Sequence, residues 1–333
     1  MTERVWAVAL IGAALAAFPC SSAAENYRWV DAHGGVHYAD RPPKPEDAGA
    51  LAPPTAAAAQ PVAPPVAPAR TGPVTVEELL ELSGMRAQLV GIASRLGGEL
   101  RPAKGQLNPR DEAAVDRILG GALHHEKIYT LMRGELRRDV DRAKLEATVE
   151  WLRSPIARKI VALEVASSET GTDQKVAAYA AGLKASPPPG QRVELLQKLD
   201  WIAGTTETST DITAAITRSV TKAVSSVSPP AQKLRPGQIE SRVAEIRNRT
   251  GELLRQVQLV TMLYAYESLE DAELGEYVRF SASDAGRWYN GRMHKALVSA
   301  VVTVVERTVV ELVRAVPLER WTRVLEPASR KEK

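Results

Sequence analysis

Residues 141–158, "DRAKLEATVEWLRSPIAR", decide how the helical part of this chain is interpreted, because a related stretch follows 129 positions later. That stretch is "EDAELGEYVRFSASDAGR", residues 270–287, and the two align without a gap. Five of the eighteen positions are identical, and Trp151 aligns with Phe280. Similarity at a fixed spacing is typical of repeated structural units. The sequence therefore predicts two copies of one four-helix unit.

A second, shorter pair of stretches favours the same interpretation. "EELLELSGM" (77–85) is similar to "VELLQKLDW" (193–201) at an offset of 116. The offsets differ by 13 residues (129 − 116), which places an insertion in the Ser/Thr-rich segment 204–228 of the second copy. The expected parts are repeat 1 at 74–185, a Pro-rich linker at 186–190, repeat 2 at 191–326 and a charged tail at 327–333.

Capping residues and helix breakers divide each copy into helices. Asn-Pro at 108–109 and Ser-Pro at 154–155 each place a capping side chain before a proline, a combination typical of the first helical turn. We expect one helix that starts at Asn108 and bends at the Gly-Gly pair 120–121, because glycine weakens a helix interior. The helix that starts at Ser154 is expected to run towards Leu183.

Two later stretches have long apolar patterns. From Ile239 to Tyr264, apolar residues alternate steps of four and three. This pattern fits an intramolecular helix hairpin or an intermolecular coiled coil, and the hairpin is favoured because another half of the chain is available for packing. The most apolar run, 296–316, contains four charged residues on one helical face, so it predicts a core helix rather than a membrane span.

The first residues have the features of a signal peptide. A positively charged start precedes the apolar run Val5–Phe18, which is shorter than the roughly 20 residues that a membrane span needs. We expect residues 1–24 to be removed by cleavage after Ala24, which places the protein in the periplasm. The alternative is a lipoprotein anchored through Cys20, but the Phe-Pro pair before this cysteine does not fit a lipidation signal.

Composition excludes several functional classes. Cys20 is the only cysteine, so the mature chain is expected to have no disulfide, no thiol catalysis and no cysteine-ligated zinc. The net charge of +3 is small for 43 basic and 40 acidic residues, which gives no reason to expect a nucleic-acid partner. We also expect no cofactor and no transmembrane segment in the mature chain.

An aromatic module is expected at residues 25–45. Residues 27–43 read "YRWVDAHGGVHYADRPP", in which two alternating stretches flank a Gly-Gly turn, as in a β-hairpin. A lone two-stranded hairpin is marginal in water, so the rings of Tyr27, Trp29 and Tyr38 are expected to stack on each other, on the helical part or on a partner. The Pro- and Ala-rich stretch 46–73 that follows predicts a disordered linker.

Residues 27–43 resemble the family called domain of unknown function 4124. The family pattern is an aromatic-x-Trp-Val-Asp strand, a glycine-containing turn, a second strand ending in Tyr-x-Asp, and Pro-Pro. The resemblance implies an N-terminal envelope module of proteobacteria that occurs ahead of varied partner domains and has no established activity.

The repeated helical stretches, among them "ELLELSGM" and "EWLRSPIAR", resemble the family called domain of unknown function 2059. This resemblance implies an all-helical exported protein. The family phrase Ser-Pro-x-Gly is incomplete in both copies, which have Ala157 in place of glycine and Asp284 in place of proline. The expected fold is all-α, a two-repeat bundle of about eight helices, preceded by the small β-hairpin module and the Pro/Ala linker.

Histidine clusters offer two candidate metal sites, and both have simpler structural interpretations. Adjacent histidines on a helix point about 100° apart, so His124 and His125 with Glu126 are poorly placed to share one ion. His33 and His37, with Asp31 or Asp40, could ligate a metal across the hairpin, but turn and strand roles explain these residues equally. We therefore predict no metal site.

The duplicated stretches contain a candidate anion site. Ser154 and Ser283 are expected helix N-caps, and Arg158 and Arg287 follow four residues later. A helix N-terminus with a nearby guanidinium could bind a carboxylate or a phosphate. The alternative is that each serine only caps its helix and each arginine pairs with a neighbouring acid.

Neither phosphate loops nor nucleophile elbows occur in the sequence, so it predicts a non-catalytic protein that interacts with an envelope protein or a cell-wall component. One alternative is a periplasmic binder of a small anionic or lipidic ligand in a cleft between the repeats. A more remote alternative is a hydrolytic enzyme.

Overall fold

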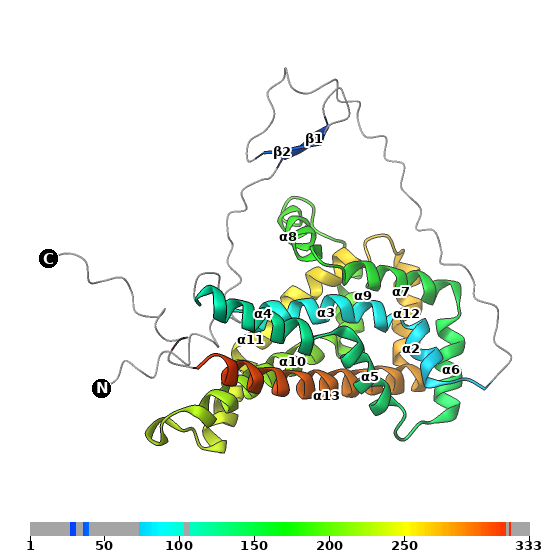
Figure 1. Ribbon diagram of the computed structural model, residues 1–333. Coiled ribbons are helices and arrows are strands. Elements are labelled where there is room, and N and C mark those ends of the chain that lie inside the picture. Colours follow the sequence, from blue (N-terminus) through cyan, green and yellow to red (C-terminus); the bar gives the residue numbers. More distant parts are fainter. Residues whose placement is uncertain (1–26, 31–35, 40–72, 103–106, 318–319, 321–333) are drawn as a thin grey trace. The chain divides into compact units, whose positions relative to one another are not determined.

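The computed structural model describes residues 27–30, 36–39, 73–102, 107–317 and 320. The chain divides into two units, of which residues 14–68 contain both strands and the other contains the helices. The helical unit is built of helices alone in its described residues, which confirms the all-α prediction (Figure 1). Its helices are α2 (Val76–Leu82), α3 (Met85–Leu100), α4 (Pro109–Ala122), α5 (His125–Leu136), α6 (Arg142–Leu152), α7 (Pro155–Ser167), α8 (Thr172–Gly182), α9 (Gly190–Ala203), α10 (Thr205–Val227), the short 3₁₀ helix η1 (Pro230–Gln232), α11 (Pro236–Ala265), α12 (Asp271–Ala282) and α13 (Asp284–Ala315).

The N-terminal unit contains β1 (Tyr27–Val30) and β2 (Val36–Ala39), which pair antiparallel. Their register places Trp29 opposite His37. The predicted signal peptide, residues 31–35 between the strands, residues 40–72 of the predicted module and linker, and the predicted tail at 327–333 lie outside the described residues. The hairpin module and the linker therefore stay predictions.

Two stretches predicted as single helices are each divided in two. The helix that begins at Pro109 ends at Ala122, directly after the Gly-Gly pair where a bend was expected, because His124 caps a new helix by accepting the N–H of Glu126 at 3.3 Å. The helix expected from Ser154 to Leu183 is broken before α8 by Gly171, which has a left-handed φ of 88°. The helical unit consequently has more helices than the predicted eight.

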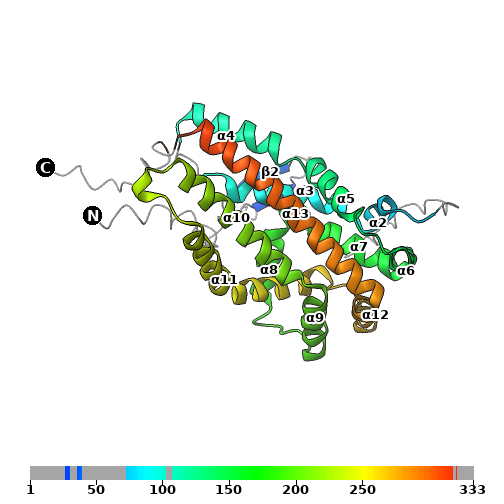
Figure 2. The ribbon, with the colours of Figure 1, turned by 90° about the horizontal axis from the view of Figure 1, so that it is seen from below.

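Helix α13 is the packing centre of the helical unit. It packs along α4, α5, α6, α10 and α12 (Figure 2). Its buried face is made mainly of small apolar side chains, which allow neighbouring helices to approach closely. Helix α11 packs on α10, as the predicted intramolecular hairpin requires, and also on α7, α8 and α9. None of the helices in the described part of the chain is long and apolar enough to cross a membrane.

The two aligned stretches have corresponding local structure. Helices α6 and α12 begin 129 positions apart, at Arg142 and Asp271, and α7 and α13 begin at Pro155 and Asp284 with the same offset. The aligned residues Trp151 and Phe280 stack on each other, with ring centroids 3.7 Å apart and planes only 2° from parallel. Duplication of the whole unit stays a prediction.

Candidate functional site

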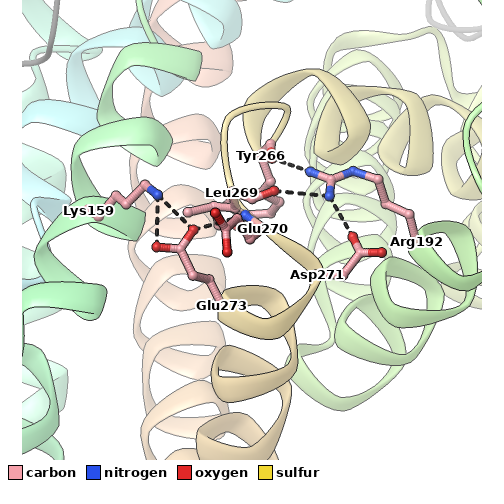
Figure 3. Close-up of polar contacts among 7 residues, drawn as sticks. All are labelled: Lys159, Arg192, Tyr266, Leu269, Glu270, Asp271 and Glu273. Carbon is pink, nitrogen blue, oxygen red and sulfur yellow. Dashed lines mark hydrogen bonds and ion pairs between the residues drawn. The ribbon is translucent and has the colours of Figure 1, made fainter.

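Polar side chains from several helices converge on the turn between α11 and α12 (Figure 3). Arg192 on α9 donates to the carbonyl oxygens of Tyr266 and Leu269, and its Nη1 lies 2.7 Å from Asp271 Oδ1. The carbonyls at the end of a helix have no partners within that helix. A guanidinium, with several donors in a fixed plane, can satisfy them while it pairs with a carboxylate. Arg192 therefore fixes the turn against α9.

A lysine on α7 holds the same region from another side. Lys159 Nζ lies 2.8 and 2.6 Å from the two carboxylate oxygens of Glu273 on α12, and Glu273 also accepts the N–H of Glu270 at 2.9 Å. The hydrogen bond from Lys159 lowers the pKa of Glu273. The start of α12 is thus tied to α7, whereas Arg192 ties the preceding turn to α9.

A half-buried acid, Glu164 on α7, forms the centre of the site. Its Oε1 atom accepts the hydroxyls of Tyr266 at 2.8 Å and of Tyr277 at 2.9 Å, and Gln88 supplies a further hydrogen bond. Desolvation raises the pKa of the Glu164 carboxyl, and the three hydrogen bonds only partly oppose this shift. The protonated form therefore persists to a higher pH than it does in an exposed glutamate.

Tyr289 extends these contacts to α13. Its hydroxyl bonds the side chain of Ser83, and Gln88 Nε2 donates to the Ser83 carbonyl at 3.2 Å. Burial raises the pKa of the phenols of Tyr266, Tyr277 and Tyr289, so all three stay protonated donors. We call this set the Glu164 network; its members are Ser83, Gln88, Glu164, Tyr266, Tyr277 and Tyr289.

Two glycines bring the turn before α3, and α3 itself, close to α7 and the acid. Gly84 has a left-handed φ of 65°, and a Cβ there would lie 2.8 Å from Val161 Cγ1 and 2.7 Å from Val165 Cγ2. A Cβ at Gly91 would lie 1.7 Å from the carbonyl oxygen of Ser168. Only glycine, which has no Cβ, permits these two approaches. Gly84, the glycine of "ELSGM" (81–85), therefore has a structural role that the apolar pattern of this stretch does not indicate.

Sequence reasoning missed the Glu164 network, although one signal for it was present. Glu164 is the single charged residue in the segment 161–167, "VALEVAS". An isolated acid in an apolar helical stretch indicates a buried or perturbed carboxyl. Its partner Tyr266 is 102 positions away, a separation that no local pattern reveals.

The predicted anion-site residues have local partners. Ser154 Oγ accepts the N–H of Ala157 at 3.2 Å, and Ser283 Oγ accepts that of Gly286 at 3.0 Å. Arg287 lies 2.5 Å from Asp284 and also donates to the carbonyl of Ala282. The side chain of Arg158 is half-buried and forms no hydrogen bond or ion pair within the described residues. Anion binding by these four residues stays a prediction.

The predicted docking residues lie on the two strands. Tyr27 is opposite Ala39, Trp29 is opposite His37, and Tyr38 is opposite Arg28. Of the other residues in the candidate hairpin metal site, Asp31, His33 and Asp40 lie outside the described residues.

The other histidines have structural partners. His124 and His125 stack with ring centroids 4.5 Å apart, and His125 Nε2 is 3.5 Å from Glu126. His294 lies between Thr208, 2.7 Å from its Nδ1, and Asp211, 3.2 Å from its Nε2. Within the described part of the chain, no group of three or more histidine, cysteine or acidic residues could hold a metal ion.

The Thr208, His294 and Asp211 arrangement resembles the geometry of a nucleophilic triad. Thr208 Oγ1, however, lies 2.8 Å from the carbonyl oxygen of Gly204 as well as 2.7 Å from His294 Nδ1, so its single proton has two acceptors within reach. Asp211 is also 2.6 Å from Arg247, which makes this cluster a link between α10, α11 and α13.

Comparison with known proteins identifies a family for the N-terminal unit only. Residues 13–70 match the family described as domain of unknown function (DUF4124), which supports the resemblance of the aromatic module. No curated protein and no solved structure matches the chain. The likeness of the helical unit to domain of unknown function 2059 therefore stays a prediction, and the chain is similar to DUF4124 over residues 13–70 alone.

Proposed function

We propose that the chain is an exported, non-catalytic interaction protein of the periplasm, whose module at residues 25–45 docks on an envelope protein or a cell-wall component. The observation that carries this proposal is the match of residues 13–70 to a family whose extent ends before the helical unit. A separate, aromatic-rich module suits docking, because Trp and Tyr are enriched among the residues that dominate binding energy. Tyr27, Trp29 and Tyr38 are the expected anchors.

The chemistry of the helical unit supports a scaffold rather than an enzyme. The strongest candidate acid, Glu164, accepts hydrogen bonds from two tyrosines, and none of the described histidines joins them. Within the described residues, the triad-like cluster of Thr208, His294 and Asp211 joins three helices, and its threonine hydroxyl also lies within hydrogen-bond distance of a backbone carbonyl. General acid–base and nucleophilic catalysis both require a proton that is free to move to or from a substrate.

The alternative, a binder of a small anionic or lipidic ligand, has less support. The Glu164 network contains no cationic side chain that could pair with an anion. The serines of the predicted anion site use their oxygens to cap α7 and α13. We therefore place docking by the N-terminal module ahead of ligand binding by the helices.

The test is an in-cell crosslinking pull-down of the tagged mature chain beside a version without residues 25–45. We expect a partner that the full chain captures and the shortened chain loses. A chain with Tyr27→Ala, Trp29→Ala and Tyr38→Ala should lose the same partner, whereas Arg28→Ala on the same strand should keep it. Equal captures by all four chains would contradict the proposal.

A further inference from the structure

Two carboxyl groups with different partners join α7 to α12. Glu273 on α12 is bound by Lys159 of α7, whose Nζ lies 2.6 Å from Glu273 Oε2 (Figure 3). Glu164 on α7 accepts the hydroxyl of Tyr277 on α12 at 2.9 Å, and that of Tyr266 after the end of α11 at 2.8 Å. We call these contacts the α7–α12 clasp; its members are Lys159, Glu164, Tyr266, Glu273 and Tyr277.

Few buried apolar side chains hold α7 in place. Within α7, only Ala157 and Ile160 are buried. Ile160 belongs to the apolar cluster that contains Leu274 and Val278 of α12, and two half-buried residues of α7 pack against this cluster. Segments with few buried apolar contacts open at low free-energy cost while the rest of a protein stays folded. The polar contacts of the clasp therefore supply much of the attachment of α7 to α12.

The groups that face Glu164 come from several helices, and all of them are neutral. They are Gln88 from α3, Tyr266 after α11, Tyr277 from α12 and Tyr289 from α13. Burial keeps the three phenols protonated, because it raises the pKa of each. Ionisation of Glu164 therefore places a charge without a counter-ion in a desolvated site, which is costly. This half of the clasp is most stable when Glu164 carries its proton.

The groups that face Glu273 favour the opposite charge state. Lys159 approaches from α7, and the N–H of Glu270 donates to the same carboxylate from the start of α12. Arg192 from α9 is bound to Asp271 in the same turn. The hydrogen bond from Lys159 lowers the pKa of Glu273. This half of the clasp is stable only while Glu273 is ionised.

We propose that the α7–α12 clasp is a pH-sensitive switch, which is closed when Glu164 is protonated and Glu273 is ionised and which opens as the pH moves in either direction. A rise in pH ionises Glu164, whose charge is hydrated when α7 moves away from α12. A fall in pH protonates Glu273 and releases Lys159. The proposal involves none of residues 25–45, so it is independent of docking by the N-terminal module.

The two carboxyl groups give the open fraction a minimum in the mildly acidic range. The pKa of Glu164 is raised in the closed state, so its contribution is complete below the ordinary value for glutamate, about 4.3, and is lost as the pH rises through the raised value. Between these two values, each unit of pH should raise the ratio of open to closed molecules roughly tenfold. The pKa of Glu273 is lowered, so its contribution is lost as the pH falls through that lowered value.

The test is hydrogen exchange of the full mature chain from acidic to neutral pH, with rates corrected for the intrinsic pH dependence of amide exchange. We expect protection of α7 and α12 to be highest in the mildly acidic range and to fall on both sides, while α4 keeps constant protection. Glu164→Gln should remove the fall towards neutral pH, and Glu273→Gln should remove the fall towards lower pH. Glu276→Gln, on the exposed side of α12, should behave as the unchanged chain.

A further variant separates titration from a merely structural role of the network. Tyr277→Phe keeps the ring but removes a hydrogen bond that lowers the pKa of Glu164. The fall in protection should therefore extend to a higher pH in this variant, which a loss of packing alone would not cause.

Several results would overturn the proposal. Protection of α7 and α12 that does not change with pH would do so, as would the same pH profile in the unchanged and Glu164→Gln chains. A loss of protection that is equal in α4, α7 and α12 would show global unfolding instead of local opening. Titration of the Glu164 carboxyl at or below the ordinary pKa of glutamate, measured by carbon-13 NMR, would also contradict the switch.

Discussion

The α6–α7 and α12–α13 turns have similar sequences but pack differently. In both, a serine caps the second helix by accepting the N–H three residues later. Between α6 and α7, however, two residues separate the helices, whereas Ser283 alone separates α12 from α13. The shared cap defines where each helix starts, and the residue three positions later decides how closely the two helices meet.

That residue is Ala157 in the first turn and Gly286 in the second. A Cβ at Gly286 would lie 2.0 Å from the carbonyl oxygen of Phe280 and 2.7 Å from its carbon. Ala157 carries a Cβ and is fully buried, so the first turn has room for a methyl group. Two turns with similar local sequences therefore differ in whether the packing around them has room for a side-chain methyl group.

The largest expected effect follows from exchanging these two residues. Gly286→Ala should lower the free energy of unfolding by about 3 kcal/mol, the upper end for overpacking, because backbone atoms must move. Ala157→Gly should cost about 1–2 kcal/mol, from weaker helix propensity and one lost buried methyl group. Urea unfolding measures both.

Gly291→Ala is the matched control for that exchange. Gly291 lies within α13 and would place its Cβ in open space. The substitution should therefore stabilise the protein by about 0.5–1 kcal/mol. Equal losses in the free energy of unfolding for Gly286→Ala and Ala157→Gly would contradict this prediction, since the second turn would then be no tighter than the first.

The next effect concerns the helices that follow the two turns. Position 164 on α7 is a glutamate, and the position 129 residues later on α13 is the buried Met293. Glu164→Met should cost about 2 kcal/mol at neutral pH, because two tyrosine hydroxyls lose their acceptor. Glu164→Gln keeps an acceptor oxygen and should cost clearly less. Equal losses in urea unfolding would show that the hydroxyls do not depend on the acid.

The same pair of helices should also differ in their response to pH. Burial raises the folded-state pKa of Glu164, so its stabilising contribution is complete below the pKa of an unfolded glutamate. That contribution is lost as the pH rises through the folded-state pKa, at about 1.4 kcal/mol for each unit of difference. Relative to Glu164→Gln, the unchanged chain should therefore lose stability from acidic towards neutral pH. A constant difference across this range would contradict the prediction.

Some helix starts in this structure could be predicted from the sequence, and others could not. The starts of α4, α7 and α13 were predictable, because Asn108, Ser154 and Ser283 are strong capping residues that act within three positions. The start of α5 was not, since histidine is an unusual cap. The sequence aligns Trp151 with Phe280, but alignment indicates equivalent positions and not the contact that the two rings make.

The Glu164 network depends on contacts between distant parts of the chain. Tyr266 follows the end of α11, Tyr277 lies on α12 and Tyr289 lies on α13, whereas the acid they surround lies on α7. Sequence patterns report local conformation and apolar faces, but not which polar groups meet across helices. The unusual acid within "VALEVAS" could indicate a perturbed carboxyl, but not its partners.

The smallest expected effect tests whether the two serine caps do more than cap. Ser154→Ala and Ser283→Ala should each cost about 1 kcal/mol, because each removes a hydrogen bond to a helix N–H, and Ser283→Ala also removes the hydrogen bond from its hydroxyl to the Phe280 carbonyl. Serine-to-threonine variants keep the acceptor and serve as controls.

If the caps also bind an anion, inorganic phosphate should raise the melting temperature of the unchanged chain, and Arg158→Gln should remove that rise. We expect no rise, because both serine oxygens already accept N–H groups and Arg287 is paired with Asp284. The side chain of Arg158 has no hydrogen bond or ion pair within the described residues. A phosphate effect that depends on Arg158 would therefore support an anion site at the start of α7 alone. The two turns would then differ in function as well as in packing.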